Sequence, residues 1–556
     1  MATLPAILKQ HYQTTPDHTI ITLQVSGEAD LQLSYRDLIH GSAVYAQMFA
    51  EAKISPGEVL ILILNHGPDL VYAFFGAILH GAIPAIMPFL TEKLSPEQYR
   101  ASLRALFNVT NPVGVITFPE FFAEVEQAAH NLAELKIFLP PHQSQIHKIE
   151  FNEFKGINRQ ETAIALLQHS SGTTGLQKGV ALSHEAVTNQ INSYSRAIDL
   201  RADDVVVSWL PLYHDMGLIA GFILPVLSGV PLVLMSPLDW VKAPYRMLHS
   251  VTQYRGTLTW LPNFAFNFCS QKIRTRDIEG VDLSSWRAVI NCSEPTIWDS
   301  HKQFIERFQP YGLDPQALAT SYAMAENVFA VTQSNLNQSN TVDHIDKDIL
   351  AAESRAVPSS VEDCTIGMLS AGFPIDNTKI RVLDADHHDL TERYIGQIAI
   401  KSDCMLSGYY RRPDLTAEAF TNGWYLTGDL GYITDGELFV TGRMKDIIII
   451  GGKNVYPQDL ERLAYQVEGV YPGRAAAFGI FNEQIGTEEV VIIAETDTQD
   501  AKERIIIADQ VRQQVTKGSA IALRFVELVE RGWLIKTSSG KPARNANREK
   551  YLTLYR

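Results

Sequence analysis

The sequence predicts an α/β protein with a large N-terminal domain and a small C-terminal domain. The chain has 556 residues, of which 46% are apolar, so it is long enough to bury several cores. Short apolar runs typical of strands alternate with longer helix-like stretches up to about residue 365. The pattern changes there to shorter strands, and it changes again after GRMKD (442–446).

The first region predicts mostly parallel sheets that are covered by helices on both faces. Its strand-like runs are VLILIL (59–64), VGVITF (113–118), AIALL (163–167), VVVSWL (205–210) and PLVLM (231–235). The run IAGFILPVLSGVPLVLM (219–235) is the most lipid-like, but two prolines interrupt it and it is short for a bilayer. We therefore expect it to be buried core.

The second and third regions predict smaller units. KIRVLDADHHDL (379–390) and QIAIKSDCMLSGYY (397–410) combine short strands with turn residues, which indicates a β-barrel-like or mixed β unit. After GRMKD, the runs IIIIGGKNVYPQDLERLAYQV, AAAFGIF and EEVVIIAE indicate a separate small α+β domain.

The overall charge and the cysteines limit the classes of function. The chain carries 47 basic and 62 acidic side chains, a formal net charge of −15, which argues against general attraction to nucleic acid or anionic lipid. Its four cysteines are widely separated and have no metal-ligand spacing, so a reducing compartment is expected. The first residues do not resemble a signal peptide. We therefore expect a cytoplasmic protein without an integral membrane segment.

The stretch QHSSGTTGLQKGV (168–180) predicts an anion-binding loop. Glycines allow close backbone approach, hydroxyls and backbone N–H groups supply donors, and Lys178 adds a positive charge. It is not a Walker A loop, because Gln177 and Gly179 flank the lysine. Taken alone, such a run is a linker about as often as a binding loop. The apolar strand before it and the lysine behind it favour a phosphate site.

The loop resembles the phosphate loop of the adenylate-forming enzymes, which include acyl-CoA synthetases, fatty acyl-AMP ligases, luciferases and peptide-synthetase adenylation domains. That family usually has proline before the lysine, where this chain has Gln177. Six further segments resemble family motifs in the same order: LPLYHDMGL (210–218), NCSEP (291–295), SYAMAE (321–326), WYLTGDLGY (424–432), GRMKDIIIIGGKNVYPQDLE (442–461) and KTSSGK (536–541). The resemblance spans nearly the whole chain.

The resemblance implies a particular domain organisation. The AMP-binding N-terminal domain, residues 1–442, would contain two α/β subdomains and a β-barrel-like subdomain. Residues 443–446 would form a hinge, with Lys445 at the hinge position, and residues 447–556 a small, mobile α+β domain. An isolated lysine such as Lys445 would otherwise be read as an ordinary exposed charge.

The resemblance also implies that ATP and Mg²⁺ bind to these motifs. Tyr322 would stack on the adenine, Asp429 would accept both ribose hydroxyls, and Arg443 would make a second nucleotide contact. Glu326 would help to hold Mg²⁺, for which a carboxylate oxygen is a suitable ligand. The complete set of expected nucleotide-binding residues is Ser170, Ser171, Gly172, Thr173, Thr174, Gly175, Lys178, Ser293, Glu294, Pro295, Tyr322, Ala323, Asp429, Arg443 and Lys445.

Lys541 is the expected catalytic residue. A carboxylate and the α-phosphate of ATP repel each other, so positive charge and positioning must supply most of the rate gain. By resemblance, the Lys541 ammonium would bridge the carboxylate oxygen and the α-phosphate. The small domain would then swivel away before a second substrate enters. A lysine this close to the C-terminus would otherwise be a solvated charge.

The acyl substrate is indicated by resemblance to one branch of the superfamily. LPLYHDMGL and the segment 341–375 resemble fatty acyl-AMP ligases, and Trp209, His214 and Met216 are candidates for the acyl pocket. His214 needs no acid–base role, because the substrate carboxylate is already ionised near neutral pH. We favour a ligase that passes a fatty acyl group to the phosphopantetheine thiol of an acyl carrier protein. The chain length stays open.

Parts of the sequence also fit other functions. SGTTGLQKGV and GGKNVYP resemble acyl-CoA synthetases at least as much, and such an enzyme would use CoA as the acceptor. A peptide-synthetase adenylation domain would need an acidic residue for the substrate ammonium, and a nucleotide sensor would be expected to lack Lys541. The basic ending KPARNANREKYLTLYR suggests either a contact for an acidic carrier protein or a solvated tail.

Overall fold

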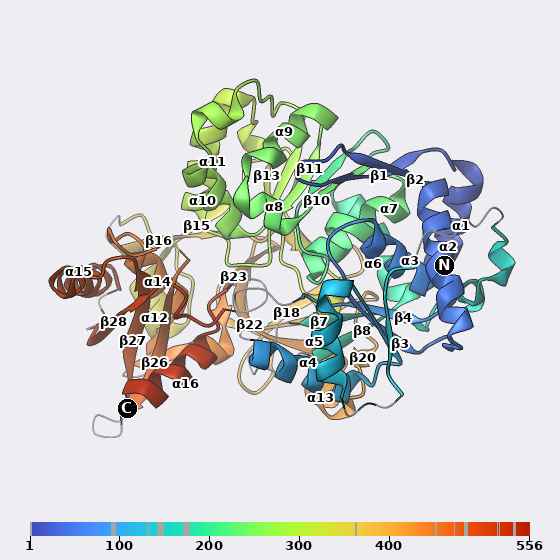
Figure 1. Cartoon of the computed structure of the whole chain (residues 1–556). Coiled ribbons are helices and arrows are strands. Elements are labelled where there is room, and N and C mark those ends of the chain that lie inside the picture. Colours follow the sequence, from blue (N-terminus) through green and yellow to red (C-terminus); the bar gives the residue numbers. More distant parts are fainter. Residues whose placement is uncertain are drawn as a thin grey trace.

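The structure is a computed structural model, shown in Figure 1. It describes residues 3–89, 96–130, 132, 134–141, 149–170, 178–361, 364–450, 453–471, 473–482, 487–519, 521, 523–536 and 541–555. The C-terminal segment, coloured red, lies at the opposite side of the view from the N-terminal helices α1 (Leu4–Thr14) and α2 (Tyr35–Glu51).

A seven-stranded sheet organises the largest part of the chain. All of its neighbouring strands pair in parallel except the pair of β1 and β2. Apart from the edge strand β2, its strands are short apolar runs that are almost wholly buried, as expected for a sheet covered on both faces. In spatial order they are β13 (Leu318–Thr320), β12 (Ala288–Asn291), β11 (Leu258–Leu261), β9 (Val206–Ser208), β10 (Leu232–Met235), β1 (Thr19–Gln24) and β2 (Leu31–Ser34).

A second, fully parallel sheet has four strands, and a small antiparallel sheet carries the two strands that flank the predicted phosphate loop. The four strands are β4 (Ile83–Ile86), β3 (Val59–Ile63), β5 (Gly114–Thr117) and β6 (Lys136–Phe138). The small sheet contains β20 (Gly408–Tyr409), β8 (Lys178–Ser183) and β7 (Ile164–Ser170).

Helices connect and cover these sheets. Some begin at a side-chain cap, as when Ser34 and Asp37 form a reciprocal capping box at the start of α2. The further helices are α3 (Pro68–His80), α4 (Pro96–Thr110), α5 (Phe122–Ala129), α6 (His184–Ala197), α7 (Leu224–Ser228), α8 (Pro237–Lys242), α9 (Tyr245–Tyr254), α10 (Asn263–Lys272) and α11 (Trp298–Phe308). Short 3₁₀ turns are Pro119–Phe121, Phe151–Glu153, Lys155–Asn158, Thr275–Ile278, Gln309–Tyr311, Pro315–Ala317 and Ala325–Asn327.

The lipid-like run 219–235 is buried core, as predicted. It continues a π-helix, Met216–Ile223, whose residues are all buried, and then forms α7 and β10. The π-helix packs so closely on the preceding turn that a Cβ on Gly217 would lie 2.3 Å from the carbonyl oxygen of Pro211. No helix in the described parts of the chain is both long and apolar enough to cross a bilayer.

An antiparallel unit follows, in agreement with the change of pattern near residue 365. Its five-stranded sheet contains β18 (Lys379–Leu383), β19 (Gly396–Lys401), β22 (Trp424–Thr434), β21 (Phe420–Thr421) and β23 (Glu437–Arg443). Two strand pairs adjoin it: β14 (Thr332–Gln333) with β17 (Phe373–Pro374), and β15 (Val342–Asp346) with β16 (Thr365–Leu369). Helices α12 (Lys347–Glu353) and α13 (Pro413–Glu418) belong to this region.

The C-terminal part has its own sheet and two apolar clusters formed by described residues from Ile448 onward. A 3₁₀ turn, Met444–Asp446, leads into it. Strand β26 pairs antiparallel with β27, and β27 pairs in parallel with β28. The elements are β24 (Ile448–Ile450), β25 (Lys453–Val455), α14 (Pro457–Ala464), β26 (Ala475–Asn482), β27 (Thr487–Thr496), α15 (Ala501–Ser519), β28 (Phe525–Glu530) and α16 (Arg544–Tyr555).

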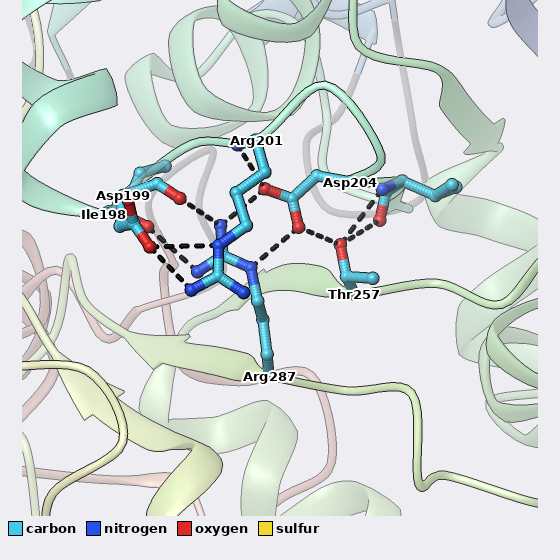
Figure 2. Close-up of polar contacts among 7 residues, drawn as sticks. Ile198, Asp199, Arg201, Asp204, Thr257 and Arg287 are labelled. Atoms are coloured by element: carbon cyan, nitrogen blue, oxygen red, sulfur yellow. Dashed lines mark hydrogen bonds and ion pairs between the residues drawn. The ribbon is translucent and has the colours of Figure 1, made fainter.

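A buried ion pair joins the amino ends of three strands of the large sheet (Figure 2). Asp204 precedes β9, Thr257 precedes β11 and Arg287 precedes β12. The Arg287 guanidinium donates to both oxygens of Asp204, at 2.7 and 2.5 Å, and to the carbonyl oxygens of Ile198 and Asp199, each at 2.9 Å. Thr257 donates to Asp204 at 2.7 Å.

This brace fixes the sheet from the end opposite the carboxyl ends of its parallel strands. Burial opposes the charge on Asp204, but the bonds from Arg287 and Thr257 hold the pKa of its carboxyl below the ordinary value. The side chains of Asp204 and Arg287 are only 2% and 13% exposed, so neither charge could be solvated if its partner were lost.

Candidate active site

The predicted site residues lie where parallel strands of the large sheet end. Trp209 follows β9, Ser293 lies two residues after β12, and Tyr322 lies two residues after β13. The carboxyl ends of neighbouring parallel strands meet at one edge, and open α/β sheets bind ligands in the crevice there. The sheet therefore brings together three segments that are far apart in the sequence.

The loop after β12 is held by a buried amide network that the sequence motifs did not predict. Asn291 donates to Asn263 at 3.0 Å, and Asn263 in turn accepts from the backbone N–H of Ile297 at 3.1 Å and donates to Ser300 at 3.1 Å. Asn291 also lies 3.0 Å from Nε2 of His301, whose pKa is lowered by burial to about 3. The imidazole is therefore neutral.

This network holds the loop in an uncommon backbone conformation. Ser293 has φ of 66°, which a non-glycine residue rarely adopts. Glu294 accepts from the backbone N–H of Phe264 at 2.9 Å, at the start of α10, and Pro295 follows. The backbone of Ala323 pairs with Ala330 in an isolated bridge, which fixes the segment that carries Tyr322.

Asp429 is the centre of a second polar cluster. The hydroxyl of Tyr322 donates to its Oδ2 at 2.6 Å, and Nε of Arg443 donates to its Oδ1 at 3.1 Å. Strands β22 and β23 place Asp429 and Arg443 directly opposite each other. Burial and the charge of Asp429 raise the pKa of Tyr322, so its hydroxyl remains a donor. Three residues predicted to contact nucleotide thus touch one another.

Tyr409 joins the lysine of the predicted phosphate loop to the predicted magnesium ligand. The Lys178 ammonium lies 4.6 Å from the centroid of the Tyr409 ring, and the Tyr409 hydroxyl donates to Glu326 at 3.0 Å. The Tyr409 and Tyr425 hydroxyls lie 3.0 Å apart. Tyr409 comes from β20, which pairs with β8, so its position depends on tertiary contacts. In the sequence, the pair of tyrosines in SGYY (407–410) was the only signal for Tyr409.

The phosphate loop itself is only partly described. Ser170 ends β7 and pairs in register with Lys178, which begins β8. Ser171, Gly172, Thr173, Thr174 and Gly175 lie outside the described residues.

Lys541 reaches the large sheet from the C-terminal part of the chain. Its ammonium donates to the carbonyl oxygen of Ser293. Burial lowers the pKa of Lys541, whereas the carboxylates of Glu294, Asp215 and Asp429 oppose that effect. Lys445 is exposed in the 3₁₀ turn Met444–Asp446 and lies on the chain between the two parts. The structure thus places Lys541 beside the predicted nucleotide residues.

An apolar wall lies at the same edge of the sheet. The Trp209 ring stacks on Trp240 with centroids 3.6 Å apart and packs edge-on against Phe264. The Met216 and Cys292 sulfur atoms are 3.0 Å apart, so the π-helix touches the loop of Ser293. His214 lies in the turn before this helix, and its carbonyl oxygen accepts from the backbone N–H of Leu218.

Asp215 belongs to the site but was missed as a candidate. Its carboxylate accepts from the backbone N–H of Met216 at 2.8 Å and caps the π-helix. Burial raises the pKa of Asp215, and Lys541 and Glu326 are among the charges that influence it. An acidic residue within the apolar surroundings of LPLYHDMGL was the available signal.

The basic residues near the C-terminus do not form a solvated tail, because α16 packs on β26. Arg556 lies outside the described residues, and a contact with an acidic carrier protein stays a prediction. Arg544 pairs with Asp446 and Glu461, Arg548 donates to the carbonyl oxygen of Gly479, and Lys550 donates to the carbonyl oxygen of Trp533. Apolar positions along the helix made this docking possible.

A model of the AMP-binding enzyme family matches residues 8–410. The chain belongs to this family. The matched range contains the phosphate loop, the π-helix, the loop of Ser293 and Glu326, and it ends before Asp429, Arg443 and Lys541.

Two proteins are similar to the chain over nearly its whole length. The medium-chain fatty acid–acyl carrier protein ligase JamA of Moorena producens is 29% identical, over 98% of this chain and 94% of the relative. The long-chain fatty acid–AMP ligase FadD26 of Mycobacterium bovis is 30% identical, over 99% and 97%.

Solved structures of the family have the same fold. One from a study of fatty acyl-adenylate ligases of E. coli and L. pneumophila has a TM-score of 0.89 and 27% identity, over 100% of this chain and 98% of that one. The L. pneumophila ligase in complex with acyl adenylate and pyrophosphate has a TM-score of 0.74 and 25% identity, over 99% and 96%. The predicted superfamily, enzyme class and α/β fold class are confirmed.

Proposed function

We propose that the protein activates a fatty acid with ATP to an acyl adenylate, releases pyrophosphate, and transfers the acyl group to the phosphopantetheine thiol of an acyl carrier protein. The main support for this proposal is the position of Lys541. Its ammonium donates to the carbonyl oxygen of Ser293, near the carboxyl ends of the parallel strands. A positive charge there can draw together a carboxylate and an α-phosphate that otherwise repel each other.

The nucleotide would lie along this edge. In this proposal Asp429 and Arg443 take the ribose hydroxyls, Tyr322 takes the adenine face, and the loop of Ser293, Glu294 and Pro295 lines the base. The triphosphate would lie in the loop 170–175, with Lys178 as its cation. The contact of Tyr322 and Arg443 with the two oxygens of Asp429 supports the shared role, because that carboxylate is already oriented before ligand binds.

The residues present fit a magnesium ion that is held mainly by substrate. No cluster of three or more His, Cys, Asp or Glu side chains that could hold a metal occurs among the described residues. Mg²⁺ in nucleotide sites is usually bound by one or two carboxylates together with phosphate oxygens. Glu326, oriented by the Tyr409 hydroxyl, would supply the protein ligand, and Mg²⁺ would neutralise phosphate charge.

The acyl chain would pack against the apolar wall. Met216 touches Cys292 in the loop of Ser293, and His214 lies in the turn before the π-helix. The buried Trp209–Trp240 stack packs on Phe264, so this region is apolar and aromatic. This composition suits a hydrocarbon tail. The names of the similar proteins, a medium-chain fatty acid ligase and a long-chain fatty acid–AMP ligase, support a fatty acid and leave its length open.

A carrier protein is favoured over CoA as the acceptor. JamA acts on an acyl carrier protein, and segment 341–375 resembles that of fatty acyl-AMP ligases. This segment also contacts the C-terminal part: Asn454 donates to Ser354 at 3.2 Å, and Lys347 donates to the carbonyl oxygen of Gly518 at 3.4 Å. The competing reading, a CoA ligase, has support from a similar protein, the putative fatty acid–CoA ligase fadD25 of Mycobacterium tuberculosis.

The domain division and the compartment complete the proposal. Residues 1–442 would form the AMP-binding domain, 443–446 the hinge and 447–556 the mobile domain. The two apolar clusters from Ile448 onward support an independently packed C-terminal unit. The described cysteines Cys269, Cys292, Cys364 and Cys404 are free thiols, which supports the cytoplasm.

An acceptor competition tests the proposal. The enzyme is incubated with ATP, Mg²⁺ and a series of saturated fatty acids, first without acceptor and then with equal amounts of CoA and a holo acyl carrier protein. We expect acyl adenylate to accumulate without acceptor, and the thioester to form on the carrier, as detected by mass spectrometry. Rapid formation of acyl-CoA would show instead that the protein is a fatty acid–CoA ligase. Absence of adenylate with every acid would contradict both.

A further inference from the structure

Arg544 is at the centre of a buried group of three charges. It is the first residue of α16 and lies three residues after Lys541. Its guanidinium donates to both oxygens of Glu461, at 2.8 and 2.7 Å, and to Asp446 at 2.6 Å. The side chains of Arg544, Asp446 and Glu461 are 21%, 9% and 6% exposed, so these bonds are largely removed from water.

The two carboxylates belong to different structural units. Asp446 is the last residue of the 3₁₀ turn Met444–Asp446, which lies in the proposed hinge. Glu461 lies on α14, and it also accepts from the backbone N–H of Ala477 in β26 at 3.0 Å. Arg544 therefore ties the start of α16 both to the hinge and to the sheet of the C-terminal part.

Strand pairing holds the other side of the hinge. Arg443 is the last residue of β23, in register with Asp429 on β22, and its largely exposed side chain also pairs with that carboxylate at 3.1 Å. Between Arg443 and Asp446 lie Met444 and Lys445, which are both exposed. The backbone is thus anchored on both sides of Met444 and Lys445, and a rotation would change the torsion angles of these two residues.

The geometry of the group explains why it needs an arginine. A planar guanidinium can donate two parallel bonds to one carboxylate and a third bond to another. A lysine ammonium is a point charge on a flexible stem and cannot hold both carboxylates at these distances and angles. Replacement of Arg544 by lysine therefore keeps the charge but removes the rigid connection.

We propose that Arg544 is a positioning residue that acts through Lys541. It fixes the lysine-bearing arm to Asp446, so that the C-terminal part and Lys541 turn as one body about Met444 and Lys445. The inference rests on the proposed function, because it assigns to this rotation the delivery of the Lys541 ammonium to the site beside Ser293.

The test measures whether Arg544 acts through Lys541. Single-turnover adenylate formation is compared among the wild type, Arg544→Lys, Asp446→Asn, Lys541→Ala and the double variant with Arg544→Lys and Lys541→Ala. We expect Arg544→Lys and Asp446→Asn each to slow the reaction by at least about tenfold with little change in ATP binding, because a displacement of about 1 Å can cost up to a hundredfold. In the Lys541→Ala background, Arg544→Lys should cause no further loss.

A matched control is Arg524→Lys. Arg524 pairs with Glu489 at 2.7 Å in the same C-terminal part, but its side chain is 66% exposed, and this variant should retain the wild-type rate. Full multiplication of the two losses in the double variant would overturn the proposal, because it would show that Arg544 does not act through Lys541. Wild-type rates in both Arg544→Lys and Asp446→Asn would also overturn it.

Hydrogen exchange separates this inference from the proposed function. In nucleotide-free protein, Arg544→Lys and Asp446→Asn should accelerate amide exchange in segment 541–548, and Arg524→Lys should not. A wild type that makes no adenylate, together with accelerated exchange in these variants, would refute the proposed function and retain the anchoring of the arm. Unchanged exchange would refute the anchoring whether or not the wild type is active. Asp446→Asn keeps the Arg544–Glu461 pair and is the milder variant if Arg544→Lys is unstable.

Discussion

Replacement of Lys541 by alanine would remove the positive charge beside the loop of Ser293. Among the described residues of the motif KTSSGK, only Lys541 brings a side-chain cation to that loop. In the structure this ammonium donates to the carbonyl oxygen of Ser293, within the influence of Glu294 and Asp429. The substitution removes the charge but leaves Asp429, Tyr322 and Arg443 in place, so the predicted ribose and adenine contacts persist.

The magnitude follows from the charge and its surroundings. Two unit charges about 4 Å apart interact by about 4 kcal/mol at an effective dielectric constant near 20, which suits a partly buried site. This would be about a thousandfold in rate. Desolvation of the buried Lys541 ammonium offsets part of this attraction. We therefore expect adenylate formation to fall by at least about a hundredfold, with ATP affinity changed little.

The assay is fatty-acid-dependent exchange of labelled pyrophosphate into ATP, with ATP binding measured separately by calorimetry. Lys536→Ala is the matched control, because Lys536 belongs to the same motif but donates to the carbonyl oxygen of Gly473 within the C-terminal part. Its exchange rate should stay close to that of the wild type. Near-normal exchange by Lys541→Ala would refute the catalytic role of this lysine.

Four further predictions concern the framework of the site. Arg287→Met should lower the free energy of unfolding by about 3–5 kcal/mol in denaturant titrations, because it leaves the carboxylate of Asp204 buried and unpaired; a loss below about 1 kcal/mol would contradict the brace. Gly217→Ala should cost about 1–3 kcal/mol, since its Cβ would meet a carbonyl oxygen at 2.3 Å; unchanged thermal stability would count against this packing. Tyr409→Phe removes the bond to the proposed magnesium ligand, so the apparent Mg²⁺ affinity in the adenylation assay should fall about 10–100-fold, and an unaltered Mg²⁺ dependence would argue against that ligand. The free energy of unfolding should fall by about 2 kcal/mol between pH 7 and pH 5, because buried His301, with a pKa of about 3, stays neutral while the unfolded chain takes up a proton near pH 6.5. This free energy should depend less steeply on pH in His301→Gln, and an equally steep dependence in the variant would contradict the role of His301.

The sequence predicted those parts of the site that local pattern controls. Apolar runs located β3, β5, β7, β9 and β10, whereas Trp209 and Ser293 were found through the resemblance of their motifs. Asp429 and Arg443 pair in register on β22 and β23, which are joined by a short turn.

The parts that were missed depend on contacts between distant segments. Tyr409 touches Glu326, which is 83 residues away, and Arg544 touches Asp446, which is 98 residues away. No local periodicity reports such pairs. The π-helix was missed for another reason: MGLIAGFI is apolar on all sides, so its pattern does not separate an α-helix from a π-helix.

The central claim is that a fatty acid carboxylate attacks the α-phosphorus of ATP. The direct test uses a fatty acid labelled with ¹⁸O in both carboxyl oxygens, followed by transfer of the acyl group to a thiol. The account predicts that the AMP released carries one ¹⁸O atom in its phosphate and that no ADP forms. Label in inorganic phosphate, with ADP as the nucleotide product, would contradict it.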